Sequence, residues 1–219
     1  MTGLDAQTRR AFALRLHDVG ALRFGAFTLK DGSTSPVYCD LRLLIADPEA
    51  LRLAGRIYAV LLAPLQYDVI AAIPYAGLPL GTAAALEVGR PMVFPRKEAK
   101  DYGAGNAIEG RYQAGQTAVV LDDLVSSGLS KRQAIAPLEA AGLIVHDIVV
   151  LVDRRRSGPD ALVEDGYALH AAFNLTELAA ELAAAGRIEA AAASRVATFL
   201  GGPASAPAQG HHLSTLTGA

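Results

Sequence analysis

The sequence predicts an α/β fold with a mainly parallel central sheet flanked by helices. Three short apolar runs, at 68–73, 118–121 and 147–152, have the composition of strands buried on both faces of a sheet. The first two runs lead through a short turn into a helical pattern, the order expected of parallel βα units. A chain of 219 residues that is 52% hydrophobic and 19% charged can also bury a full core.

The N-terminal part is predicted to hold a surface helix, a hairpin and a second helix. Residues 4–20 place apolar side chains among charges at helical spacing, and 48–62 form an amphipathic helix. Between them, Asp31-Gly32 is a strong turn signal after the strand-like stretch 22–29. Three polar or aromatic side chains are expected at alternate positions of the returning strand, namely Tyr38, Asp40 and Arg42.

Strands and helices are expected to alternate through the rest of the chain. The strand at 68–73 ends in a tight loop, 74–79, before a helix near Leu80. Such loops lie at the carboxyl edge of a parallel sheet, where open α/β sheets bind ligands. Further elements are expected as a strand at 91–95, a helix at 131–141, a strand at 167–173, a helix capped by Thr176 and a helix at about 188–200. The tail 201–219 is rich in small residues and proline and is expected to be disordered.

The most informative stretch is 117–130, where a strand, an acidic pair, a hydroxyl-rich loop and a helix start follow in order. Backbone N–H groups of a Ser/Gly loop at a helix start form an anion site, and Gly128 lets the backbone approach the anion. Asp122 and Asp123 can accept hydrogen bonds from sugar hydroxyls or help to hold a divalent cation. The order therefore predicts a site for a ribose 5-phosphate.

Taken one at a time, these residues also have ordinary explanations. An aspartate at a strand end often caps the next helix, and Ser-Gly loops are common. The whole order is more specific than its parts. Two other phosphate motifs are excluded, because the chain has neither Gly-x-x-x-x-Gly-Lys nor Gly-x-Gly-x-x-Gly after a strand.

Two charged stretches are open to two interpretations each. Residues 96–110 contain three glycines, three basic residues and few apolar side chains, so they cannot pack into a core. They form either a solvated hairpin or a cationic lid that closes over a polyanion. Asp153–Arg156 follows the strand at 147–152 and is either a solvated charge run or a site of anion capture.

Bulk properties argue against several classes of protein. A net charge of −2 provides no basic field for nucleic acid and no polybasic run for a membrane surface. One cysteine, Cys39, excludes an internal disulfide framework and fits a reducing cytosol. No apolar signal segment opens the chain, and no stretch approaches the roughly 20 apolar residues of a membrane span. We therefore expect a cytoplasmic protein with neither a nucleic-acid nor a membrane partner.

Four separate motifs together resemble one family over roughly residues 20–180. Residues 119–130 resemble the phosphoribosyl pyrophosphate (PRPP) motif of the type I phosphoribosyltransferases. Residues 27–42, 74–79 and 96–110 are similar to the hood segment, pyrophosphate loop and catalytic loop of the orotate phosphoribosyltransferases. The resemblance implies the type I phosphoribosyltransferase fold in a single domain at 1–200. Its expected parts are a hood from about 20–45 and 158–180 over a core at about 48–156.

The same resemblance assigns roles by position. Lys100 would be the principal catalytic lysine, acting with Asp122 and Asp123, which fix the ribose through its hydroxyls. The implied PRPP-binding residues are Tyr75, Ala76, Arg96, Lys97, Lys100, Tyr102, Asp122, Asp123, Leu124, Val125, Ser126, Ser127, Gly128, Leu129 and Ser130. The implied orotate-binding residues are Lys30, Tyr38, Ser126 and Arg154.

Two residues of the implied site differ from those found in some members of the family. Tyr102 stands where many bacterial members have histidine, and it keeps a hydrogen-bonding group but no charge. Ala76 stands where some members carry a lysine. In the family this loop often contains a non-proline cis peptide, which we expect immediately before Ala76.

The implied activity is that of an orotate phosphoribosyltransferase, a glycosyltransferase of pyrimidine (UMP) biosynthesis. It would transfer the 5-phosphoribosyl group from PRPP to orotate, giving orotidine 5′-monophosphate and pyrophosphate. Mg²⁺ would be held mainly by PRPP and water, with no direct protein ligand. The enzyme would be a homodimer whose catalytic loop serves the neighbouring subunit.

Two alternatives remain open at this stage. Another type I phosphoribosyltransferase, acting on a purine base, would share 117–130 but lack the Lys-Glu-Ala-Lys-Asp-Tyr-Gly sequence at 97–103. A PRPP-sensing regulator should show a basic face and no catalytic loop, and the charge of −2 counts against it.

Overall fold

A six-stranded sheet forms the centre of the molecule. The computed structural model describes residues 3–29, 32–96, 107–126, 128–156 and 161–201. The strands lie in the order β5-β4-β3-β6-β7-β8, and only β5 is antiparallel to its neighbour. Their bounds are β3 Val69–Ala72, β4 Met92–Pro95, β5 Ile108–Glu109, β6 Thr117–Val125, β7 Ile144–Asp153 and β8 Ala168–Asn174. The predicted α/β fold with a mainly parallel sheet is therefore confirmed.

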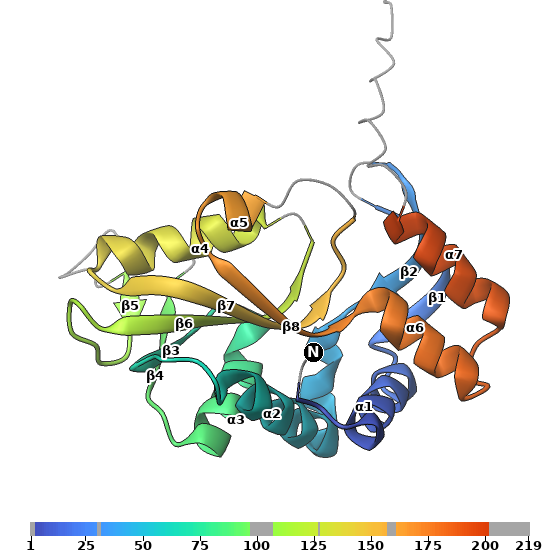
Figure 1. Ribbon diagram of the computed structural model, residues 1–219, viewed down its shortest axis with the longest axis horizontal. Helices are drawn as coiled ribbons and strands as arrows, with labels where there is room; N and C mark the ends of the chain where they lie inside the picture. The colour runs from blue at the N-terminus through green and yellow to red at the C-terminus, as the bar shows by residue number, and fades with distance from the viewer. Residues whose placement is uncertain (1–2, 30–31, 97–106, 127, 157–160, 202–219) are drawn as a thin grey trace, which may run out of the picture.

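Helices cover both faces of this sheet (Figure 1). Strand β6 shows why, because its side chains alternate between two cores. Val119 and Leu121 pack into the core on one side, while Ala118 and Val120 pack into the core on the other. None of the four is more than 1% exposed, as expected of a parallel strand between two helix layers. The covering helices are α2 (Pro48–Leu62) and α3 (Gly77–Val88) on one face, and α4 (Leu129–Ala140) and α5 (Ala161–Glu164) on the other.

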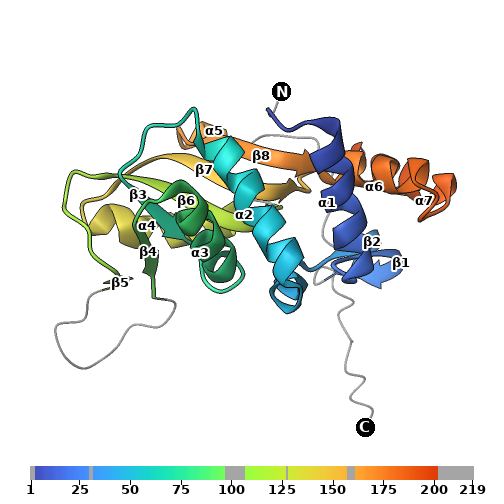
Figure 2. The ribbon, with the colours of Figure 1, turned by 90° about the horizontal axis from the view of Figure 1, so that it is seen from below.

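A separate antiparallel hairpin lies at one end of the molecule, beside three helices (Figure 2). The predicted turn is confirmed by pairing on both sides of it, and Gly32 has φ of +81°. Phe12 stacks on Phe173 with ring centroids 5.2 Å apart, which links this end to the large sheet. The elements are β1 (Leu22–Thr28), β2 (Thr34–Cys39), α1 (Ala6–Asp18), α6 (Leu175–Ala184) and α7 (Ala190–Gly201). A short 3-10 helix, η1 (Leu41–Ala46), which was not predicted, connects the hairpin to α2.

Two element boundaries in the central part differ from the prediction. Strand β6 continues to Val125, so that Asp122 and Asp123 lie inside the strand instead of after it. The reason is that parallel pairing with β7 persists to its end, with Val125 opposite Asp153. Helix α3 begins at Gly77 instead of near Leu80.

Two expectations for the C-terminal part were wrong. Segment 158–180 was expected to belong to the hood, but its strand β8 lies in the large sheet, parallel to β7. A cross-strand contact of 2.7 Å between His170 Nε2 and Asp147 Oδ1 accompanies this pairing. Helix α6 is capped by Asn174 instead of Thr176, because the Asn174 side chain accepts the backbone N–H of Glu177 at 2.7 Å.

The described residues include no helix that is both long and apolar enough to cross a bilayer. The predicted tail lies almost wholly outside the described residues.

Candidate functional site

The predicted site residues that the structure describes gather at the carboxyl edge of the sheet. Tyr75 follows β3, Arg96 follows β4, the acidic pair lies near the end of β6, and Arg154 follows β7. Because these strands are parallel and adjacent, their carboxyl ends meet at one edge. The predicted positions of Lys30, Lys97, Lys100, Tyr102 and Ser127 lie outside the described residues, and so do the side chains of Leu129 and Ser130.

Asp122 is fixed from three sides. Its side chain is 9% exposed, and Oδ2 forms an ion pair with Nζ of Lys131, which is 4% exposed. Oδ1 accepts the backbone N–H of Asp123 at 2.8 Å. The backbone carbonyl oxygen of Asp122 accepts the Tyr58 hydroxyl at 2.6 Å. This carboxylate therefore lies inside the protein, against a buried cation.

Asp123 has a different environment. Its Oδ1 accepts the backbone N–H of Leu124 at 2.8 Å, and its side chain also interacts with that of Asp122. Burial, followed by the charge of Asp122, raises the pKa of Asp123 to about 7. Asp123 is partly exposed, whereas Asp122 is buried.

The loop after β6 has the geometry predicted for a phosphate site. Gly128 caps α4 with φ of +76°, and no described side chain caps the helix start. A Cβ at this position would lie 2.8 Å from Leu162 Cγ, so both conformation and space require glycine. Uncapped N–H groups at the positive end of a 12-residue helix favour an anion. Ser126 is exposed at the mouth of this loop.

The loop after β3 contains a cis peptide, but one residue earlier than expected. It joins Pro74 to Tyr75, so the prediction of a cis bond immediately before Ala76 was wrong. Ala76 already has helical dihedrals, and the N–H of Gly77 donates to the carbonyl oxygen of Ile73 at 3.0 Å. The chain therefore turns before Ala76, which belongs to the start of the helix. Tyr75 is 60% exposed.

The three arginines after β7 have separate environments. Arg155 forms an ion pair with Asp153 at 2.6 Å, and Arg156 lies 4.0 Å from the centre of the Phe199 ring. The side chain of Arg154 makes no hydrogen bond or ion pair with any described residue, although its backbone N–H donates to the Val125 carbonyl oxygen at 3.0 Å. Of the three, Arg154 is the one left available for a ligand anion.

Tyr38 lies on the hairpin within an aromatic and cationic stack. Its ring centre is 5.6 Å from that of Phe27, and the Arg23 guanidinium lies 4.8 Å from the Tyr38 ring centre.

The neighbouring Cys39 is buried, and burial raises the pKa of its thiol to about 12. Cys39 is therefore a neutral core residue and not a nucleophile.

Arg96 stands at the entrance to the undescribed segment 97–106. Its guanidinium is ion-paired with Glu109 across the β4–β5 pair, and its backbone N–H donates to the Ala107 carbonyl oxygen at 2.8 Å. The structure thus shows Arg96 joining the two ends of that segment. Its predicted contact with pyrophosphate stays a prediction.

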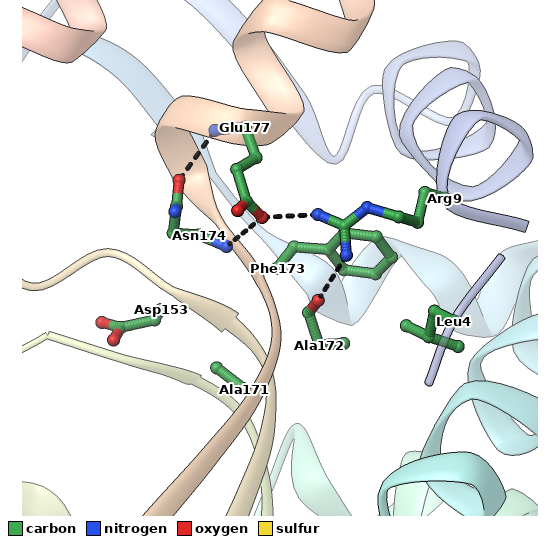
Figure 3. A pocket seen from close by; sticks show the side chains of 8 residues that line it. All are labelled: Leu4, Arg9, Asp153, Ala171, Ala172, Phe173, Asn174 and Glu177. Atoms are coloured by element: carbon green, nitrogen blue, oxygen red, sulfur yellow. Dashed lines mark hydrogen bonds and ion pairs between the residues drawn. The ribbon is translucent and has the colours of Figure 1, made fainter. Parts of the chain in front are cut away.

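A separate cavity of about 490 Å³ opens at the ends of β7 and β8 (Figure 3). Arg9 lies in it, paired with Glu177 at 2.6 Å and donating to the Ala172 carbonyl oxygen at 3.4 Å. Its guanidinium is also 5.1 Å from the centre of the Phe173 ring. These polar groups satisfy one another, so the cavity is a structural junction between α1, β8 and α6.

Comparison with known families gives one match, which covers residues 46–164 and is described as a phosphoribosyl transferase domain. It spans β3, β4, β6 and β7, including the acidic pair within β6 and Arg154 after β7. The chain belongs to the phosphoribosyltransferase family.

Relatives within this family carry the name orotate phosphoribosyltransferase. The protein of that name from Pyrobaculum aerophilum is 38% identical over 169 residues, which is 77% of this chain and 88% of the relative. The bifunctional enzyme PyrF/PyrE of Nostoc sp. is 39% identical over 175 residues, 80% of this chain and 37% of the relative. The solved structure of Leishmania donovani UMP synthase superposes with a TM-score of 0.80 and 41% identity, over 90% of this chain and 42% of that one. The chain thus spans about two fifths of these two larger proteins.

Sequence reasoning missed two residues of this phosphoribosyltransferase site. Lys131 was assigned only to the start of a helix, and Tyr58 only to an apolar helix face. One signal was present for Lys131, since a cation in the first turn of a helix is disfavoured by the helix dipole and calls for a nearby anion. Tyr58 gave no such signal, because its partner is the backbone of a strand 64 residues away.

Proposed function

We propose that this chain is an orotate phosphoribosyltransferase, which transfers the 5-phosphoribosyl group from PRPP to orotate and releases pyrophosphate. The observation that carries the proposal is the adjacency of an acidic pair and an uncapped helix start at the end of one strand. Support also comes from the orotate phosphoribosyltransferase of Pyrobaculum aerophilum, most of whose length this chain matches.

The chemistry requires pyrophosphate to leave C1 of the ribose through a state with oxocarbenium character. Asp123 accepts hydrogen bonds from the ribose hydroxyls, and the loop at 126–130 holds the 5′-phosphate at the start of α4. Negative charge grows on the departing pyrophosphate, so positioned cations stabilise the transition state most. Lys100, Arg96 and Lys97 are assigned to this task.

The base site is assigned to Arg154, Tyr38, Lys30 and Ser126. Orotate is a planar anion, and the guanidinium of Arg154 presents paired donors in a plane that matches a carboxylate. Because orotate is already anionic, the reaction needs no strong general base. Closure of the segment 96–110 would exclude water, which otherwise competes for the ribosyl group.

Mg²⁺ fits this site as part of the substrate. It keeps several waters and binds substrate phosphates in preference to an all-protein cage. The described residues contain no group of three or more His, Cys, Asp or Glu side chains that could hold a metal ion. We assign the ion to oxygens of PRPP and to water. When bound, it neutralises charge on the leaving pyrophosphate.

We also propose a homodimer in which the segment 96–110 serves the neighbouring subunit, and a cytoplasmic location. The free, buried state of Cys39 fits a reducing compartment. Co-expression of a Lys100→Ala chain with an Asp123→Asn chain tests the shared site, since mixed dimers should regain activity. Absence of any complementation would mean that the loop acts within its own subunit.

The deciding assay is the loss of orotate absorbance on addition of PRPP and Mg²⁺. Adenine, hypoxanthine and uracil are the controls, because a purine-specific enzyme of the same fold would consume one of them instead. Turnover of orotate alone supports the proposal. Turnover of a purine with none of orotate would reject it.

A further inference from the structure

A buried ion pair lies behind the acidic pair of the ribose site. Taken as whole residues, Lys131 is 3% exposed and Asp122 is 7% exposed. The lysine side chain reaches from the first turn of α4 back to strand β6. Removing a charge from water without a partner is costly, and breaking a buried pair leaves the remaining charge uncompensated. The two charges therefore depend on each other.

The position of Lys131 is unfavourable in its own helix. It is the third residue of α4, where the helix dipole presents its positive end. An apolar side chain would occupy the same buried position without this cost. The presence of a lysine at this buried position is therefore explained by Asp122, which supplies the opposite charge.

The two carboxylates of the pair differ in what they can still bind. Both oxygens of Asp122 are engaged within the protein, Oδ1 by the backbone N–H of Asp123 and Oδ2 by Lys131. Asp123 uses Oδ1 for the backbone N–H of Leu124, forms no ion pair with Lys131, and interacts with the Asp122 side chain. It is the more exposed carboxylate of the two, since Asp122 is buried and Asp123 is partly exposed.

We propose that Lys131 is a positioning residue of the ribose site: it holds Asp122 as a fixed, internally neutralised carboxylate and leaves Asp123 to take the ribose hydroxyls. This inference rests on the proposed function. The sequence assigned the binding of the ribose hydroxyls to both aspartates, and the inference now assigns it to Asp123 alone. It predicts that Lys131 acts on PRPP binding without touching PRPP.

The same ion pair sets the ionisation of Asp123. Burial and the charge of Asp122 raise its pKa to about 7, while the charge of Lys131 lowers it. A protonated Asp123 would donate a hydrogen bond where an ionised one accepts two, so its ionisation affects how it holds a diol. Three further titratable or charged groups face the pair from the packed elements, namely Tyr58 from α2, Cys39 from β2 and Arg42 from η1.

The first test measures the titration of Asp123 in the unliganded full chain by carboxyl ¹³C NMR, with the signal assigned through Asp123→Asn. Lys131→Met should raise the midpoint, because an opposite charge is lost. Lys131→Arg should stay close to wild type. Arg132→Met removes the neighbouring charge, which pairs with Asp165 on the other side of the helix, and should also leave the midpoint unchanged. An unchanged midpoint in Lys131→Met would overturn the proposal.

The second test measures kcat and KM for PRPP between pH 5.5 and 9. For a shift of one pKa unit, Lys131→Met should raise KM for PRPP about fivefold near pH 7, with recovery at higher pH. A purely structural defect would instead lower the active fraction equally at every pH. If wild type fails to use orotate, the proposed function falls, while the NMR titration still decides the role of Lys131.

A third variant covers the case in which Lys131→Met is too unstable for the titration and the kinetics. The double variant Asp122→Asn with Lys131→Met removes both charges, so it should be more stable to urea than Lys131→Met alone. Equal or lower stability of the double variant would contradict the ion-pair role.

Discussion

The Tyr58 hydroxyl donates a 2.6 Å hydrogen bond to the backbone carbonyl oxygen of Asp122. Tyr58 lies in α2 and is fully buried, and its partner lies near the end of β6, 64 residues further along the chain. The contact ties a covering helix to the strand segment that presents the acidic pair. Backbone and side chain of Asp122 are thus held by α2 and α4 from opposite sides of the sheet (Figure 1).

Tyr58→Phe should therefore lower the free energy of unfolding by about 1–3 kcal/mol, because a buried carbonyl loses its donor. Urea denaturation measures the loss. Tyr167→Phe is the matched control, since that hydroxyl bonds to Glu139 Oε1 at 3.0 Å in an exposed position. The control should change stability by no more than about 0.5 kcal/mol. Equal losses of unfolding free energy in both variants would show that the buried hydrogen bond to Asp122 stabilises the fold no more than the exposed one does.

Asp123→Asn should stabilise the protein at pH 8. The folded-state pKa of Asp123 is about 7, above its ordinary value of 3.8, so the ionised form is disfavoured by folding. The stability that this group contributes is fully present below about pH 4 and is lost as the pH rises through 7. The asparagine variant lacks this loss and should be more stable than wild type by about 2–4 kcal/mol at pH 8.

Urea unfolding at pH 4.5 and pH 8 checks this prediction, and the difference should shrink at the lower pH. Asp5→Asn is a control of opposite sign, since the backbone N–H of Thr8 holds the pKa of Asp5 below its ordinary value. The stability that Asp5 contributes is present above about pH 4 and is lost as the pH falls below that value. A pH-independent effect of Asp123→Asn would contradict the raised pKa.

Gly81→Ala should destabilise the contact between α3 and the sheet. A Cβ there would lie 2.6 Å from the Ala72 Cβ and 3.2 Å from Met92 Sδ. Overpacking of this kind costs about 1–3 kcal/mol, measured as a lower midpoint of thermal or urea unfolding. Gly201→Ala is the control, because nothing lies within 4 Å of its added Cβ. A loss in the control as large as that at Gly81 would rule out a steric cause.

Lys100→Ala should reduce turnover by about 10²–10³-fold, corresponding to about 3–4 kcal/mol of transition-state stabilisation. PRPP affinity should be largely kept, because the loop at 126–130 and Asp123 still hold the ribose phosphate. Steady-state kinetics with orotate and direct PRPP binding separate the two effects. Glu98→Ala alters the same segment at a residue with no assigned role and should retain activity. Near-normal turnover in Lys100→Ala would remove the catalytic assignment.

Much of the fold could be predicted because its signals are local. The runs at 69–72 and 117–121 are apolar at every position or nearly so, which marks strands covered on both faces. Helix α2 has the predicted bounds, since Asp47 caps it and Pro48 begins it. The placement of β8 could not be predicted, because joining β7 or the hairpin depends on partners distant in the chain.

The sequence by itself determined the order of strand, acidic pair, glycine loop and helix, and with it the family. That order is encoded within 14 consecutive residues, where composition and spacing fix the local backbone. Only the tertiary structure decided that Asp122 and Asp123 have different environments. Their difference comes from the Lys131 ammonium group, which pairs with Asp122 when α4 packs on the sheet, whereas burial and the charge of Asp122 raise the pKa of Asp123.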